Sequence, residues 1–289
     1  MRPNNMMLNI RIKLMAIPAL AIVLGAPTHE ALAAHILEPL GTEIASTSPR
    51  GRMFGQIVYH YSKFENGTTV KTHLLPVEFE AGIGERTQLN LEGVVVLREE
   101  VGAAREHGVD ELAFGVKHRF VDEGRVTPDM AFEAEYVPSA GLAGNGKAVA
   151  ATLILSKNLT PRFVLHLNGG YELETERELE VETDPDFLGS GQTVVTEVVE
   201  GVHNQASIFY NIAPMFKVIP DKLILLAELN GHTHASGDTE LVVAPEVIAV
   251  IQSETFFALQ NIAFKLAVPF GLNDDSPDMG IRFGISKLF

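Results

Sequence analysis

The chain of 289 residues contains no cysteine and no tryptophan. The missing cysteines exclude a disulfide framework, a thiolate metal site and a lipid-anchored amino-terminal cysteine. Basic residues are scarce, with 22 Lys and Arg against 37 Asp and Glu and a net charge of −15, which argues against a nucleic-acid partner. No apolar run in the sequence reaches the roughly 20 residues that a membrane-spanning helix needs.

The amino terminus has the pattern of an export signal. Arg2, Arg11 and Lys13 precede the apolar run at 14–25, and small residues near position 34 are spaced for signal-peptidase cleavage. A transmembrane anchor is the weaker alternative because about 12 apolar residues are too few to span a bilayer. We therefore predict a signal peptide at 1–34, which implies export.

The exported chain alternates between apolar and polar residues with a period of two. Phe114 and Val116, for example, alternate with Lys117 and Arg119. Such a pattern is typical of β-strands with one apolar and one polar face. About twelve segments of this kind are separated by Gly, Pro, Asn and Asp clusters. The predicted strands are 52–64, 73–84, 87–98, 110–121, 128–138, 148–158, 162–176, 203–217, 222–234, 240–251, 257–271 and 279–289.

The length of these segments favours a membrane barrel over a soluble sandwich. Sandwich strands usually have about 5–6 residues, whereas a tilted membrane-spanning strand needs about 9–11. Inside lipid a sheet must close so that no backbone group stays unpaired. The predicted fold is all-β: a single antiparallel transmembrane β-barrel of about twelve strands at 51–289, of the outer-membrane type. Residues 35–50 form an amino-terminal periplasmic segment, either a tail or a short plug.

The connections between the predicted strands give an independent indication. Outer-membrane barrels have short periplasmic turns and longer outer loops. The connections after the second, sixth and eighth strands are short, whereas those after the first, third, seventh and ninth are longer, including "ENGTTVKT" and "EEVGAAREHGVD". This order predicts that both ends of the barrel domain lie on the periplasmic side of an outer membrane in a Gram-negative bacterium.

Four segments carry a resemblance to a known family: 112–141, 153–171, 227–231 and 271–289, the last reading "GLNDDSPDMGIRFGISKLF". Together they resemble the MetA-pathway of phenol degradation family of outer-membrane β-barrel transporters, over most of 70–289. The resemblance implies an outer-membrane barrel and carries little about the solute. The terminal Phe289 is similar to the end of the strand that the barrel-assembly machinery recognises, although Lys287 interrupts the apolar row.

The polar row of the strands is predicted to line the lumen. An excess of carboxylates there would favour cations or neutral polar solutes and oppose anions. Some charges must pair across strands because an unpaired buried charge is costly. The predicted pore-lining residues are Glu78, Glu80, Glu92, Arg98, Lys117, Arg119, Glu133, Glu135, His166, Glu172, Glu174, Glu228, Lys265 and Arg282.

An acidic stretch, "YELETERELEVETDPD", continues this row. A helix would place like charges one turn apart, so the stretch is predicted to be a strand that rises out of the bilayer and turns back near 188–192. Its acids would either concentrate cations at the pore mouth, including ions that bridge lipopolysaccharide, or keep a solvated loop soluble. The members beyond the pore-lining set are Glu176, Glu178, Glu180, Glu182, Asp184 and Asp186.

Three other sites receive weaker support. The stretch 141–148 nearly matches a phosphate-binding loop, but Ala148 replaces the required Ser or Thr and a strand follows. His232 and His234, with His203 on the preceding strand, could bind a metal ion or form a polar rim. For a lipid hydrolase, His203 and Ser207 lie about 13 Å apart along a strand, too far for a catalytic pair.

The function predicted from the sequence is passive transport of small solutes through an outer-membrane pore, with neither enzymatic activity nor a cofactor or metal. The expected partners are outer-membrane lipid and lipopolysaccharide, the barrel-assembly machinery and the solutes, and no nucleic acid. Two alternatives stay open: a structural or surface-interaction barrel with a closed lumen, and a lipid-modifying enzyme.

Overall fold

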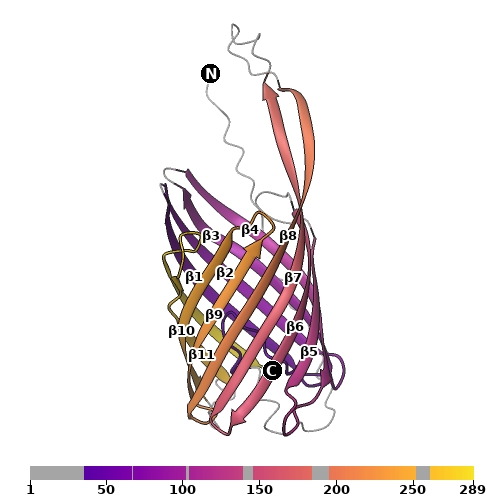
Figure 1. Cartoon of the computed structure of the whole chain (residues 1–289), viewed down its shortest axis with the longest axis vertical. Coiled ribbons are helices and arrows are strands. Elements are labelled where there is room, and N and C mark those ends of the chain that lie inside the picture. Colours follow the sequence, from indigo (N-terminus) through magenta and orange to yellow (C-terminus); the bar gives the residue numbers. More distant parts are fainter. Residues whose placement is uncertain (1–35, 67, 102–103, 139–145, 184–194, 252–260) are drawn as a thin grey trace.

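The structure, a computed structural model, describes residues 36–66, 68–101, 104–138, 146–183, 195–251 and 261–289. It is a closed β-barrel whose strands tilt steeply across its wall (Figure 1). Within these residues no helix combines the length and apolar composition that a membrane crossing requires.

The strands follow one another around the barrel in chain order. Their bounds are β1 (Met53–Asn66), β2 (Thr68–Gly82), β3 (Thr87–Val101), β4 (Ala104–Val121), β5 (Asp129–Val137), β6 (Gly146–Thr160), β7 (Phe163–Thr183), β8 (Val195–Ile219), β9 (Leu223–His234), β10 (Thr239–Ile251), β11 (Ile262–Ala267), β12 (Phe270–Gly271) and β13 (Met279–Leu288). Every neighbouring pair is antiparallel, and β1 closes the barrel on β13 through pairs from Phe54–Leu288 to Lys63–Met279. The predicted all-β antiparallel barrel is therefore confirmed.

The wall contains twelve strands because β11 and β12 are two parts of one interrupted strand. Both parts pair with β10 on one side and with β13 on the other. Pro269 lies in the interruption, and a proline has no N–H to donate to the ladder. The strand count expected from the sequence agrees with this arrangement.

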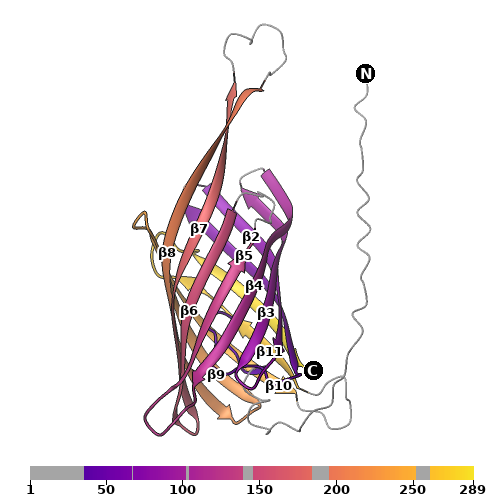
Figure 2. The ribbon, with the colours of Figure 1, turned by 90° about the vertical axis from the view of Figure 1, so that its right-hand side faces the viewer.

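Several strands are longer than the sequence predicts. "ENGTTVKT" and "EEVGAAREHGVD" were expected to be loops, but their described residues lie mainly in β1 to β4, which pair as far as Asn66–Thr68 and Val101–Ala104. Antiparallel strands satisfy each other's backbone groups, so pairing continues past the end of the apolar alternation. β7 and β8 pair as far as Thr183–Val195 and rise above the rest of the wall (Figures 1 and 2).

The two rows of side chains lie on opposite surfaces of the wall. On β4, Phe114 and Val116 are 48% and 45% exposed on the outer surface, whereas Lys117, which follows Val116, and the next strand's Glu133 are buried inside. An outer-membrane barrel has this arrangement, with an apolar band facing lipid and a polar interior. The side-chain period of two explains why the sequence predicted the faces correctly.

Short turns and both ends of the barrel domain lie at the same rim. The connections 83–86, 161–162 and 220–222 are short, and the carboxyl terminus lies at the same end (Figure 1). Met53 and Phe289 exchange backbone hydrogen bonds there, with N–O distances of 3.5 and 2.7 Å. In bacterial outer-membrane barrels the rim with short turns faces the periplasm.

The segment before the first strand lies inside the barrel. The sequence left 35–50 open between a periplasmic tail and a short plug, and the described residues 36–50 lie within the barrel, as a plug does. Leu40 and Gly41 donate backbone hydrogen bonds to Glu246 on β10 and Glu228 on β9, both on the inner surface. The segment, indigo in Figure 2, crosses the lower part of the interior. We call residues 36–50 the inner segment.

Candidate functional site: the barrel lumen

An apolar belt lines the lumen near the periplasmic rim. Ile36 and Leu37 of the inner segment are buried against this belt, where both would otherwise meet water. The sequence analysis missed the belt because its residues occupy the row predicted to be polar. The only signal was local, since stretches such as "LILLAEL" are apolar on both faces. The wall residues of the belt are Phe54, Val164, Ala213, Met215, Ile224, Leu226, Ile248, Ala263 and Leu288.

Carboxylates of the wall accept hydrogen bonds from the backbone of the inner segment. Leu40 N lies 3.0 Å from Glu246 Oε2, and Gly41 N lies 3.0 Å from Glu228 Oε1. Both glutamates are buried, at 4% and 0% exposure. Backbone N–H groups enclosed in a barrel need such partners. These two contacts fix the path of the segment on the β9–β10 side.

Further contacts hold the inner segment on the opposite wall. Ala45 N donates to Ser156 Oγ on β6 at 2.9 Å, and the hydroxyl is 2.8 Å from Nδ1 of the predicted lumen residue His166. Ser48 N donates to Gln88 Oε1 on β3 at 2.7 Å, and its hydroxyl donates to Glu80 at 3.2 Å. The segment is therefore attached to strands on both sides of the lumen.

A buried lysine ties the inner segment to the wall by charge. The Lys117 ammonium is fully buried and lies 2.5 Å from Glu43 Oε2, 3.6 Å from Glu80 Oε1 and 3.8 Å from Glu38 Oε1. Carboxylate oxygens of Glu38, Glu43 and Glu80 come close enough together to hold a metal ion. Lys117 supplies a positive charge at this cluster, so the arrangement is a buried ion-pair network.

A second buried lysine lies on the β11 wall. Lys265 Nζ donates to Gln56 Oε1 at 2.5 Å and lies 5.8 Å from the centre of the Phe54 ring. Gln56 in turn donates to the predicted lumen residue Glu78 at 3.3 Å. Lys265 is therefore held inside the barrel, on the polar row where the sequence placed it.

Acidic side chains surround a cavity of about 310 Å³ on the β3–β7 side of the lumen. Glu92, Glu133, Glu135 and Glu172, all predicted lumen residues, line it together with Glu43 of the inner segment. Asn90 donates a hydrogen bond to Glu133, and no cation side chain lines this cavity. A positive or neutral polar solute is electrostatically favoured there over an anion.

The remaining predicted lumen residues lie near the rims or share other partners. Arg98 pairs with Glu100 on the outer part of β3, and Arg119 lies 3.5 Å from Asp122 near the lower rim. Arg282 Nη1 lies 4.0 Å from Glu228 Oε2 inside the barrel. Glu174 lies on the inner parity of β7 and is partly buried.

The acidic hairpin is described only in its backbone. Residues 176–183 continue β7 and pair with β8, so the predicted strand character is present. Their side chains, and Asp184 and Asp186 altogether, lie outside the described residues. The expected role of the acids Glu176, Glu178, Glu180 and Glu182 therefore stays a prediction.

The suggested histidine site is only partly assembled. The rings of His232 and His234 lie 4.3 Å apart between centres. The strand register places Ser207 opposite His234, however, and places His203 opposite Glu176 on β7, four residues further out. Four residues of strand span about 13 Å, so the backbone does not bring His203 level with the pair.

The other weak sites gain nothing from the described residues. Most of the stretch 141–148 that nearly matches a phosphate-binding loop, including Gly141, lies outside the described residues. Ala148 lies in strand β6 rather than in a helix. The Ser–His contact that the structure does contain, Ser156 with His166, is enclosed between the wall and the inner segment. Membrane lipid has no access to a pair in that position.

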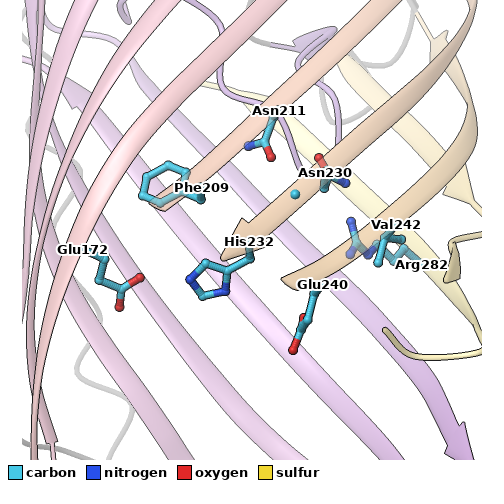
Figure 3. A pocket seen from close by; sticks show the side chains of 9 residues that line it. Glu172, Phe209, Asn211, Asn230, His232, Glu240, Val242 and Arg282 are labelled. Atoms are coloured by element: carbon cyan, nitrogen blue, oxygen red, sulfur yellow. The ribbon is translucent and has the colours of Figure 1, made fainter. Parts of the chain in front are cut away.

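A further cavity of about 330 Å³ lies against strands β7 to β10. Its lining includes Phe209, Asn230, His232 and Glu240, with Arg282 from β13 facing them (Figure 3). A third cavity of similar size lies between the inner segment and β1 to β3. The polar cavities of the lumen thus adjoin one another, since Glu172 and Phe209 line both the acidic cavity and the cavity against β7 to β10.

The structure is similar to solved outer-membrane barrels. An outer membrane channel from Pseudomonas putida F1 matches with a TM-score of 0.60 and 12% identity, over 88% of this chain and 100% of that chain. The translocator domain of the autotransporter NalP from Neisseria meningitidis matches with 0.51 and 13%, over 90% and 93%. The porin NanC matches with 0.51 and 8%, over 82% and 98%. At these identities the likeness shows the fold alone.

No protein-family model matches the chain, and no curated protein matches its sequence. The three neighbours named above are a channel, a porin and a translocator domain. The likeness therefore shows the fold of an outer-membrane barrel.

Proposed function

We propose that this chain forms an outer-membrane pore for small cationic or neutral polar solutes. The observation that carries the proposal is the acidic lining of the lumen, in which carboxylates from β3, β4, β5 and β7 surround a cavity without a cation on its wall. A low-dielectric wall strengthens the effect of these charges on an entering ion. An anion is repelled there, whereas a cation is concentrated.

We also propose that the chain belongs to the MetA-pathway of phenol degradation family and is exported by the signal peptide at 1–34. The four sequence segments that resemble this family and the barrel fold support membership. The outer-membrane fold supports the location. Outer-membrane lipid, lipopolysaccharide and the barrel-assembly machinery, which would read Phe289, are the partners that such a location implies.

The proposed pore has two states. In the resting state the inner segment is docked in the lumen, and in the conducting state it is displaced. Its contacts with both walls fill the lower lumen at rest, so solute passage requires displacement of residues 36–50. The segment adjoins β1 only at its carboxyl-terminal end, near Gly51, so it can leave the lumen without unpairing a strand. Permanent closure is the second candidate function, favoured by the buried Lys117 network.

Reconstitution of the purified protein into planar bilayers tests the proposal. We expect ion conductance with a reversal potential that favours cations in a salt gradient, and permeation of neutral polar solutes in liposome swelling. Replacement of Glu133 and Glu135 by Gln should lower the cation preference. Glu85→Gln is the matched control, since Glu85 lies exposed in the turn between β2 and β3.

Two outcomes would contradict the proposal. Preference for anions in the unmodified protein would overturn the role of the acidic lining. Absence of conductance both in the unmodified protein and in Lys117→Met, in which the inner segment is expected to be released, would favour the closed structural barrel instead.

A further inference from the structure

The cavity against β7 to β10 is lined by amide, imidazole and guanidinium groups that the acidic cavity lacks, whereas Phe209 and Glu172 line both cavities. Two rungs of the wall contribute to it, because the register places His232 between Phe209 and Glu240, and Asn230 between Asn211 and Val242. Its volume of about 330 Å³ lies at the lower end of the roughly 300–1,000 Å³ of small-molecule sites. The size therefore suits a small solute.

Phe209 provides a fixed aromatic surface on this wall. A Cβ added to Gly170 on the neighbouring β7 would lie 2.1 Å from Phe209 Cζ, so the ring covers the lumen side of this glycine. The ring is therefore held against the wall by the glycine beneath it. One of its faces is available to the cavity, which it lines (Figure 3).

Polar atoms around the cavity lack partners within the described protein. Asn230 Oδ1, His232 Nε2 and Arg282 Nε are each buried without a hydrogen bond. Buried polar groups in folded proteins are usually paired, so several such atoms at one cavity indicate an absent partner. Asn230 offers an acceptor and Arg282 offers a donor.

The charges at the cavity exclude the simplest ions. Glu172 and Glu240 lie on its wall, and Arg282 is already 4.0 Å from the buried Glu228. An anion would face these carboxylates, and a metal cation would leave the Arg282 donor unpaired. A hydroxyl group both donates and accepts, so it can pair with Asn230, Arg282 or either tautomer of His232.

We propose that this cavity is a binding subsite for a neutral polyhydroxylated solute of monosaccharide size. The C–H face of the sugar ring lies on the Phe209 side chain, and the hydroxyl groups of the sugar pair with Asn230, His232 and Arg282. The inference rests on the proposed pore, because it assigns a class of solute to its lumen. Binding is weak, since a transport site has to release its solute.

Isothermal titration calorimetry of the detergent-solubilised protein with D-glucose tests the subsite without requiring a conducting pore. We expect saturable binding that weakens by about tenfold in Phe209→Leu, the loss of one aromatic contact. Asn230→Ala should weaken it as well. The matched control is Tyr210→Leu, because Tyr210 is the next residue on β8, points outward and covers Gly231 in the same manner. Heat-modifiable gel mobility verifies that each variant is folded.

The outcomes separate this inference from the proposed pore. Glucose binding that requires Phe209 but not Tyr210 supports the subsite, whether or not the protein conducts. No glucose binding by a protein that conducts cations overturns the subsite and leaves the pore standing. Binding of glycine in place of glucose assigns a zwitterionic solute to the cavity and also overturns the inference, as does glucose binding unaffected by Phe209→Leu.

Discussion

Replacement of Lys117 by methionine should release the inner segment. The lysine belongs to β4, and two of its three acidic neighbours, Glu38 and Glu43, belong to the segment. Methionine has a similar length and no charge, so the packing volume is nearly kept. The variant leaves buried carboxylates without their counter-charge while the barrel ladder stays intact.

The size of the effect follows from the burial of this network. The side chains of Lys117 and of Glu38 in the inner segment are 0% and 4% exposed, and removal of one partner from a buried ion pair costs about 3–5 kcal/mol. Proton uptake by the carboxylates limits the loss, so we use about 3 kcal/mol, the lower end of that range. Each 1.4 kcal/mol is a factor of about ten, so the ratio of displaced to docked segment should rise by about 100-fold.

Thiol labelling measures this ratio because the chain has no natural cysteine. Thr42→Cys places a single thiol in the inner segment, where Thr42 is 2% exposed. We expect slow maleimide labelling in this background and labelling about 100-fold faster after Lys117→Met is added, together with more frequent channel openings. Lys157→Met is the control, since Lys157 pairs with Glu123 outside the lumen.

A double variant separates charge from packing. Glu43→Gln combined with Lys117→Met removes one of the uncompensated carboxylates, so part of the slow labelling should return. Equal labelling rates and equal conductance in Lys117→Met and the unmodified background, with the barrel folded in both, would refute the reasoning. The ion pairs would then not hold the segment.

Three further predictions concern other parts of the molecule. Gly82→Val should expel the inner segment and speed labelling, because a Cβ there would lie 2.2 Å from two of its backbone oxygens; unchanged labelling would contradict this. Partial burial would raise the pKa of Glu123, but hydrogen bonds from Lys157 and a neighbouring asparagine lower it overall. The stability that ionised Glu123 adds to the fold is complete above its unfolded pKa of about 4.3 and is lost as the pH falls through its lower folded pKa. The variant Glu123→Gln should show no such loss of stability in denaturant unfolding. Spin labels at Leu165 and His166 should report lipid and a polar interior, and matching signals would exclude the assigned faces.

The acidic hairpin expected at the mouth of the pore shows how far the sequence pattern reaches. Its acids continue the inner row of β7 beyond Glu174, and the backbone of β7 and β8 rises above the wall (Figure 2). The even spacing of these acids predicted a strand, and the pairing of β7 with β8 confirms it. Whether those acids act on ions depends on the placement of their side chains, which spacing alone does not determine.

The sequence by itself determined the barrel and its two faces. Alternation with a period of two is a local property, so it placed Lys117 inside and Phe114 outside before any contact was known. Strand length then favoured a membrane barrel, and the need to pair every backbone group in lipid required closure. The strand ends were less well predicted, because pairing beyond the bilayer needs no apolar row.

Only the tertiary structure decided what occupies the lumen. Gly41 meets Glu228 across 187 positions of sequence and Leu40 meets Glu246 across 206, so no local pattern relates them. The apolar belt that receives Leu37 forms only when strands from both halves of the chain close into one wall. Contacts of this kind depend on closure of the barrel, which is why a short segment that resembles a tail in the sequence is an interior element of the folded protein.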